Sequence, residues 1–165
     1  MLIFGLGHIG GSIAKSLCKQ GIRVYAEDSS KKTITHAIKN KIIKGYFSDL
    51  DLSKPYSVIF STPPIVTDKL VNENKDLIKN AVLFTETSSS KNKIKKNAFI
   101  NKIQNAILSH PIAGNEGSGI DASDMKLFKN KICILSPLKM TSRNSITKAK
   151  KLWLSLIHIS EPTRQ

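Results

Sequence analysis

The sequence has few cysteines, few acidic residues and no long apolar run, and each shortage excludes a class of protein. Cys18 and Cys133 lie far apart and outside any metal-ligand spacing, which argues against a disulfide-stabilised domain and a metal centre. No apolar stretch reaches the roughly 20 residues of a membrane span, and the N-terminus lacks a signal-peptide pattern. We therefore expect a cytoplasmic protein with reduced core cysteines, no metal and no membrane partner.

Acidic residues are outnumbered, with 12 Asp and Glu against 26 Lys and Arg and a formal net charge of +14. Such an excess is typical of nucleic-acid-binding proteins. Here the basic residues are nearly all lysines scattered over expected helix surfaces, and aromatic residues that could stack on bases make up only 6%. We interpret the charge as a solvated surface with no nucleic-acid partner. A nucleotide-sensing or nucleic-acid-binding module is the non-enzymatic alternative.

The most informative motif that is present lies at the N-terminus. Four apolar residues lead into a glycine turn, and the apolar spacing that follows is helical. Strand, glycine turn and helix open a dinucleotide-binding unit, in which the turn backbone and the helix N-terminus hold the diphosphate. Gly5 permits the sharp turn, Gly7 lets the backbone approach the diphosphate, and Gly10 allows close helix packing. The expected cofactor-binding residues are Gly5, Leu6, Gly7, His8, Ile9 and Gly10.

An acidic residue follows the motif at a suitable distance. Residues 22–26 predict a return strand that ends in Glu27 and Asp28, and Asp28 lies 18 residues after Gly10. Dinucleotide-binding units carry an acid about 20 residues on, which bonds the ribose hydroxyls. We favour Asp28 because Glu27 would still lie along the strand. An acid there would repel a 2′-phosphate and so selects NAD, although Lys31 and Lys32 keep NADP open.

The rest of the chain alternates between buried strand and amphipathic helix patterns. Strands are expected at 57–61, 81–85, 106–110 and 131–137, helices from residue 29 or 30 and at 65–78, 91–104 and 141–154, and a loop with a short helical turn at 45–55. This order predicts an α/β fold with a doubly wound, mostly parallel Rossmann-type sheet. We expect one dinucleotide-binding domain at 1–153. Residues 154–165 lose the lysines and the periodicity, and we interpret them as a non-native tail.

Ligands bind at the carboxyl ends of parallel strands, where two polar segments lie. Ser61, Thr62 and Pro63 follow the 57–61 strand closely and are candidates to line the cofactor site, or they simply begin a helix. His110 ends a buried strand, where it is either a working group of an enzyme or a structural histidine.

Three segments resemble the prephenate dehydrogenase family, which includes arogenate-using relatives: residues 5–12, 86–91 and 109–119. The resemblance implies NAD-dependent oxidative decarboxylation of prephenate to 4-hydroxyphenylpyruvate in tyrosine biosynthesis. It also implies that His110 accepts the proton of the ring hydroxyl, that Ser89 holds this hydroxyl and the histidine, and that Gly114, Asn115 and Glu116 lie at the substrate site. The alternatives are an arogenate dehydrogenase and an NAD(P)-dependent dehydrogenase of the β-hydroxyacid type, and the His110 segment argues against the latter.

The chain departs from the family pattern in places. Glu86 stands where aspartate is usual, Ser88 where glycine is frequent, and His8 where an apolar residue is usual. The family also continues into an all-helical C-terminal domain, which dimerises and supplies further substrate contacts, and this chain ends before it. We therefore expect a fragment that binds NAD with little or no turnover alone, and a homodimer only for a full-length protein.

Overall fold

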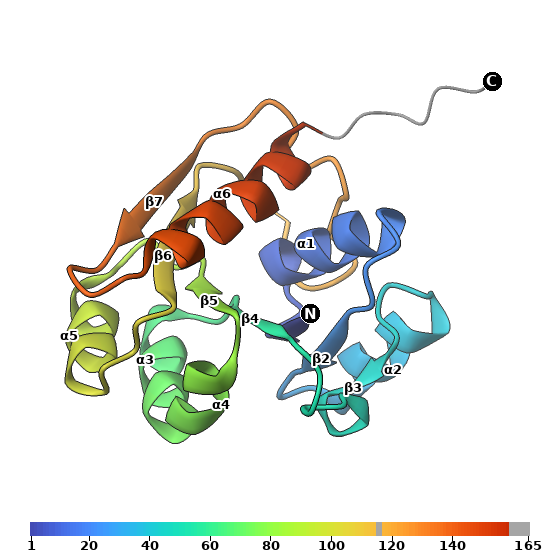
Figure 1. The fold of residues 1–165 in the computed structure, drawn as a ribbon. Helices are drawn as coiled ribbons and strands as arrows, with labels where there is room; N and C mark the ends of the chain where they lie inside the picture. Colours follow the sequence, from blue (N-terminus) through green and yellow to red (C-terminus); the bar gives the residue numbers. More distant parts are fainter. Residues whose placement is uncertain (115–116, 159–165) are drawn as a thin grey trace.

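The computed structural model describes residues 1–114 and 117–158, with the side chains of these residues apart from Phe99 and Ile100. The strands are β1 (Leu2–Phe4), β2 (Tyr25–Glu27), β3 (Gly45–Tyr46), β4 (Ser57–Phe60), β5 (Leu83–Glu86), β6 (Ala106–Pro111) and β7 (Cys133–Pro137). The helices are α1 (His8–Lys19), α2 (Lys31–Lys39), the 3-10 turn η1 (Phe47–Asp49), α3 (Pro64–Glu73), α4 (Lys75–Asn80), α5 (Asn92–Ile100) and α6 (Arg143–Ile157). Figure 1 shows how these elements are arranged.

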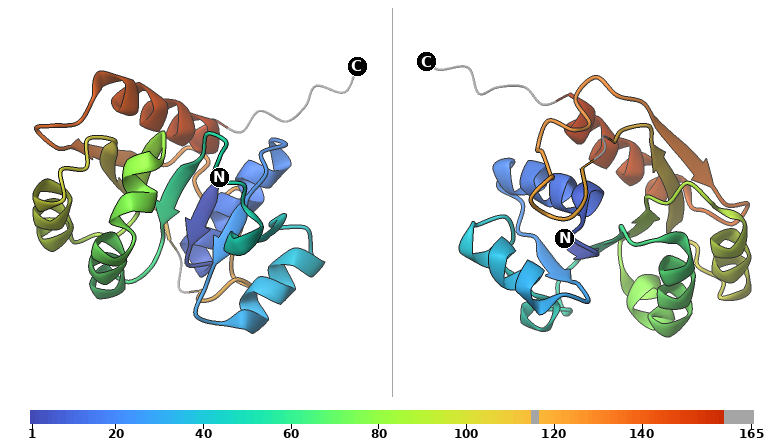
Figure 2. Two further views of the ribbon diagram at one scale, coloured as in Figure 1. Left: turned by 60° about the horizontal axis from the view of Figure 1, so that its bottom comes forward. Right: turned by 180° about the vertical axis from the view of Figure 1, so that it is seen from behind.

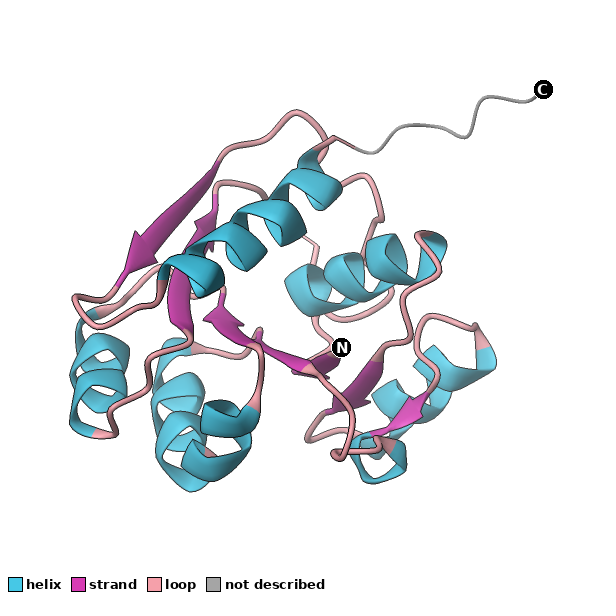
Figure 3. Ribbon diagram, in the orientation of Figure 1, coloured by secondary structure: helices cyan, strands magenta, loops and turns pink. Residues whose placement is uncertain are grey.

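The strands form one sheet with the order β3-β2-β1-β4-β5-β6-β7. All neighbouring strands run parallel except β7, which is antiparallel to β6. Helices and strands alternate along most of the chain (Figure 3). The strand order turns back between β1 and β4, which is where doubly wound sheets bind ligands. The predicted doubly wound, mostly parallel fold is confirmed.

The two faces of the sheet carry separate hydrophobic cores. One core joins residues of α1, α2 and α6 to strand residues such as Ile3 and Ile59. The other joins α3, α4 and α5 to Phe4, Val58 and Phe60. Side chains that alternate along β1 and β4 therefore serve opposite faces, as expected for a sheet covered on both sides. The views in Figure 2 show α1 and α6 together on one face.

Two helices begin close to where the sequence predicts. Ser30 caps α2, since its hydroxyl accepts a hydrogen bond from the Thr33 N–H at 3.2 Å. Ser142 caps α6 in the same way, through the Ser145 N–H at 3.1 Å. Both caps satisfy a backbone donor that the first helical turn leaves free.

The differences from the sequence prediction are local. The 45–55 loop contains the short strand β3 before its helical turn η1. The helix expected at 65–78 is divided into α3 and α4 at Asn74, whose side-chain amide donates to the Leu70 carbonyl at 3.0 Å. The helix expected at 91–104 ends at Ile100, and Lys102 follows with a left-handed φ of 53°. In the two helices, a side chain or a turn ends a helix whose apolar spacing continues.

Helix α6 continues beyond the predicted domain boundary at residue 153. It runs through Ile157, and Leu156 is fully buried in the core beside α1. The boundary therefore falls inside α6, and a non-native origin for 154–165 stays a prediction.

Trp153 is a strong test of this core. It is 2% exposed and packs edge to face on Phe128 at 5.7 Å between ring centroids. Trp153→Ala is expected to lower the free energy of unfolding by about 3–5 kcal/mol, because the cavity would not close. Leu154→Ala is the matched control, since Leu154 is 51% exposed, and should change it by less than about 0.5 kcal/mol. Urea denaturation measures both, and equal losses would contradict the packing.

Candidate functional site

The glycine turn between β1 and α1 depends on two very close backbone contacts. Gly5 has a φ of +86°, and a Cβ there would lie 2.5 Å from the Ser61 carbonyl oxygen. A Cβ on Gly10 would lie 1.9 Å from the Gly5 carbonyl oxygen. Neither position admits a side chain without displacing backbone. Gly5 and Gly10 therefore have the predicted roles of turning off the strand and packing the helix closely.

Gly7 is different, because a Cβ there would meet no atom of the protein within 4 Å. It precedes α1 with an ordinary φ of −69°, and no described side chain caps this helix. The described side chains thus leave the start of α1 uncapped, and the cofactor contacts of His8 and Ile9 stay a prediction. Free N–H groups at a helix N-terminus favour an anion such as a phosphate.

Asp28 lies against this turn. One carboxylate oxygen accepts a hydrogen bond from the Leu6 N–H at 2.8 Å, and the other accepts from the Ser30 N–H at 2.8 Å. Glu27 instead contributes its backbone carbonyl, which accepts from the Gly5 N–H at 2.8 Å, and its side chain is exposed. Asp28 is therefore the acid in contact with the glycine turn, and its ribose contact stays a prediction.

The segment after β4 joins the same edge of the sheet. The Ser61 N–H donates to the Phe4 carbonyl at 2.8 Å, and the Thr87 hydroxyl donates to the Ser61 hydroxyl at 3.1 Å. The Thr62 hydroxyl shares a 2.8 Å hydrogen bond with that of Thr67, and Pro63 is exposed at the N-cap of α3. Ser61 and Thr62 thus lead into the N-cap of α3 at Pro63, both lie against the glycine turn, and a cofactor contact of the three residues stays a prediction.

His110 lies near the end of β6, paired with Ile134 of β7. It is half-buried, and its buried Nδ1 has no hydrogen-bond partner among the described residues. That nitrogen makes no structural hydrogen bond to the backbone of the described chain. An imidazole whose ring nitrogen has no hydrogen bond can take part in proton transfer.

Ser89 is exposed, and the described residues include no hydrogen bond between it and His110. The buried serine of this segment is Ser88, which is bonded to Glu86. The structure therefore shows no direct bond between Ser89 and His110 in the described chain, and the role of Ser89 stays a prediction. Gly114 is exposed at the end of the first described range, whereas Asn115 and Glu116 lie outside the described residues.

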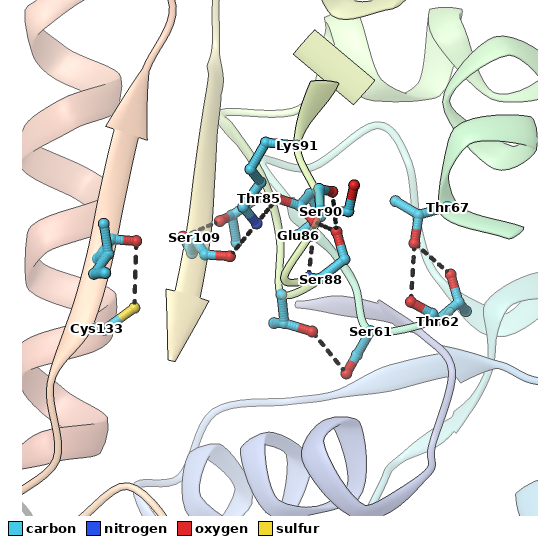
Figure 4. A network of polar contacts seen from close by, with 12 residues as sticks. Ser61, Thr62, Thr67, Thr85, Glu86, Ser88, Ser90, Lys91, Ser109 and Cys133 are labelled. Atoms are coloured by element: carbon cyan, nitrogen blue, oxygen red, sulfur yellow. Dashed lines mark hydrogen bonds and ion pairs between the residues drawn. The ribbon is translucent and has the colours of Figure 1, made fainter. Parts of the chain in front are cut away.

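The 86–91 segment, in which sequence reasoning gave Glu86 and Lys91 no role, forms a polar network with Ser109 (Figure 4). Glu86 is fully buried and forms an ion pair with Lys91, which also donates to the Ser109 carbonyl. Burial lowers the pKa of Lys91, and the negative charge of Glu86 opposes that shift. Burial raises the pKa of the Cys133 thiol on β7 to about 12, against the influence of Lys91. The signal in the sequence was an acid at a strand end with a lysine five residues later.

Other features of the described chain lie apart from this edge. A groove of about 610 Å³ is lined by residues of α1, α2 and the 123–125 segment, and it includes none of the predicted site residues. His36 at its border is exposed and lies 3.4 Å from Asp121, as a surface histidine would. The described residues hold no group of three or more potential metal ligands, and no described helix combines the length and apolarity that a membrane crossing requires.

Comparison with known proteins agrees with these observations. A family model described as the nucleotide-binding domain of prephenate dehydrogenase matches residues 13–157. The chain belongs to this family. The resemblance predicted from residues 5–12, 86–91 and 109–119 is therefore confirmed.

Individual members of the prephenate dehydrogenase family show how much of their length this chain covers. A protein of Bacillus subtilis (strain 168) named prephenate dehydrogenase is 30% identical over 159 residues, which are 92% of this chain and 43% of that protein. A crystal structure of prephenate dehydrogenase from A. aeolicus, in complex with hydroxyphenyl propionate and NAD⁺, has a TM-score of 0.83 at 28% identity and covers 94% of this chain and 56% of that one. Synechocystis arogenate dehydrogenase has a TM-score of 0.79 at 25% identity, over 95% of this chain and 57% of that one. This chain thus spans about two fifths of its curated relative.

The glycine turn gives a prediction that separates folding from binding. Gly7→Ala should leave the free energy of unfolding unchanged, because the new methyl group meets no protein atom. It should weaken NAD⁺ binding by about tenfold or more, or 1.4 kcal/mol, because that methyl group occupies the approach to the diphosphate. Gly10→Ala is the comparison variant and should lose both stability and binding. Calorimetry measures NAD⁺ binding and urea denaturation measures the free energy of unfolding. Unchanged NAD⁺ affinity in Gly7→Ala would contradict the assignment of Gly7 to the diphosphate site.

Proposed function

We propose that this chain is the NAD-binding part of an enzyme that oxidatively decarboxylates prephenate to 4-hydroxyphenylpyruvate, a step of tyrosine biosynthesis. The observation that carries the proposal is the place of His110, whose buried Nδ1 has no partner among the described residues, at the same sheet edge as the open turn at Gly7. A chain of contacts along the ends of β1, β4 and β5 supports it, from Phe4 to Ser61 and on to Thr87. The A. aeolicus relative, whose complex contains NAD⁺, supports the choice of cofactor.

The residues present fit this cofactor. A Cβ on Gly7 would enter the open space over the first turn of α1, where the diphosphate would lie. Bound NAD⁺ would supply the acceptor for the hydride that leaves the hydroxyl-bearing ring carbon. His110 would take the hydroxyl proton as that carbon becomes a carbonyl, and loss of carbon dioxide makes the ring aromatic. The proton held by His110 would return to the phenolate oxygen that forms on decarboxylation, so the products are 4-hydroxyphenylpyruvate, carbon dioxide and NADH with no net proton released.

Arogenate is the second candidate substrate, because the Synechocystis relative is named for it. Membership of the prephenate dehydrogenase family argues against the β-hydroxyacid and nucleic-acid alternatives.

We propose a cytoplasmic location, which the two free cysteines support. For a longer protein we propose a homodimer formed through a further helical domain. The exposed Ile132 and Ile134 on and beside β7 provide apolar surface for such a domain.

Asp28 gives a test of cofactor choice. Asp28→Asn keeps an oxygen that can accept from Leu6 but removes the charge that would repel a 2′-phosphate. The preference for NAD⁺ over NADP⁺ should fall by about tenfold, or 1.4 kcal/mol. Glu27→Gln is the matched control, because it removes an exposed neighbouring charge, and should leave the preference unchanged. Calorimetry with both nucleotides measures this, and an equal effect of the two variants would contradict the role of Asp28.

The reaction itself is tested in a longer protein, because the relatives are longer than this chain and we expect little turnover from it alone. We would replace the matching segment of the Bacillus subtilis prephenate dehydrogenase with this chain and follow NADH absorbance with prephenate and with arogenate. NADH should form with one of them, and His110→Gln should lower kcat by about 10²–10⁴-fold. His36→Gln is the control and should change nothing. A chimera that binds NAD⁺ but oxidises neither substrate would contradict the proposal.

A further inference from the structure

Strand β5 is shorter than the strand beside it, and this leaves the Ser109 carbonyl of β6 without a strand partner on that side. The last pair between them is Glu86 and Leu108, whereas β6 continues to Pro111 and is paired there with β7 alone. The Asn105 carbonyl accepts from the Phe84 N–H at 3.0 Å and so faces β5. Carbonyl directions alternate along a strand, so the Ser109 carbonyl, four residues on, faces the same side beyond the end of β5. A buried carbonyl in this position needs another donor.

Lys91 is that donor. Its ammonium group lies 2.5 Å from the Ser109 carbonyl oxygen and also forms an ion pair with Glu86. The side chain of Lys91 is only 13% exposed and that of Glu86 is fully buried. The second carboxylate oxygen of Glu86 accepts from the backbone N–H of Ser88 at 2.8 Å and from its hydroxyl. Figure 4 shows Lys91 reaching from the segment after β5 to Ser109 on β6. A buried charge pair with this many hydrogen bonds has a fixed geometry.

The side chain of Ser109 is fixed as well. Its hydroxyl accepts from the indole N–H of Trp153 at 2.9 Å and shares a 2.5 Å hydrogen bond with the Thr85 hydroxyl. Ser109 is therefore held at both its carbonyl and its side chain, immediately before His110. The Nδ1 of His110 has no partner among the described residues. The backbone that carries the imidazole is therefore held at Ser109, whereas Nδ1 is not held by a hydrogen bond from the described residues.

We propose that Lys91 is a positioning residue for His110, which it orients by holding the Ser109–His110 peptide in place of the missing strand partner. Glu86 anchors the ammonium group, and Ser88 anchors Glu86. The inference rests on the proposed function, because His110 needs a fixed orientation only if it accepts a proton from a substrate hydroxyl. The geometry that it describes belongs to this chain whether or not the chain turns over a substrate.

The test is an NMR titration of the His110 ring in this chain, with its signals assigned by their loss in His110→Gln. Lys91→Met should displace the ring signals and move the titration midpoint, while NAD⁺ affinity by calorimetry stays unchanged. Lys91→Arg keeps the charge and the donors and should restore both ring properties. Lys93→Met is the matched control, because Lys93 is an exposed lysine two residues later, and should leave the ring unaffected.

Lys91→Met leaves Glu86 buried without its partner, so a second variant covers the case in which that protein unfolds. A double variant with Glu86→Gln and Lys91→Met lacks both charges, and this protein should fold. Its His110 signals should still be displaced, because the Ser109 carbonyl has no donor. Wild-type His110 signals in the double variant would overturn the inference. Lys91 would then serve only to balance the charge of Glu86. The titration needs no cofactor, so it tests the inference even if the chain does not bind NAD⁺. Failure of the wild-type chain to bind NAD⁺ would count against the proposed function instead.

Discussion

The approach of α1 to the end of β1 is the contact on which the rest of the candidate site depends. A Cβ on Gly10 would lie 1.9 Å from the Gly5 carbonyl oxygen, so the helix can pack at this distance only without a side chain. The same approach places the first turn of α1 over the carboxyl end of the sheet, with its backbone amides uncapped. An anion at that point gains both the free donors and the positive end of the helix dipole.

The other polar groups of the site follow from the sheet order. Since β4 lies beside β1 and β5 beside β4, the ends of these strands bring Ser61 next to the glycine turn and Thr87 next to Ser61. The edge then continues to Glu86 and His110, where β6 is longer than β5. The chain is rich in exposed lysines, and Lys91 is one that the fold buries to satisfy a carbonyl at this edge.

Local features of the site could be predicted from the sequence, whereas contacts across the chain could not. The roles of Gly5, Gly7 and Gly10 depend on the conformation of a few consecutive residues, and the spacing of Asp28 is set by one βαβ unit. The hydrogen bond from Trp153 to Ser109 joins residues 44 apart, and it exists only because α6 folds back over the sheet. Ser88 is buried in place of Ser89, and its N–H and hydroxyl donate to the buried Glu86 carboxylate, a contact that apolar periodicity does not predict.

The central claim is that a nicotinamide dinucleotide binds with its diphosphate over Gly7 and its reactive ring beside His110. Nuclear Overhauser effects between NAD⁺ and the His110 ring, measured on this chain with saturating NAD⁺, test it most directly. The account predicts a cross-peak between the nicotinamide protons and the His110 imidazole, absent in His110→Gln. Bound NAD⁺ whose nicotinamide protons show no contact with that imidazole, or whose adenine protons show it instead, would contradict the account.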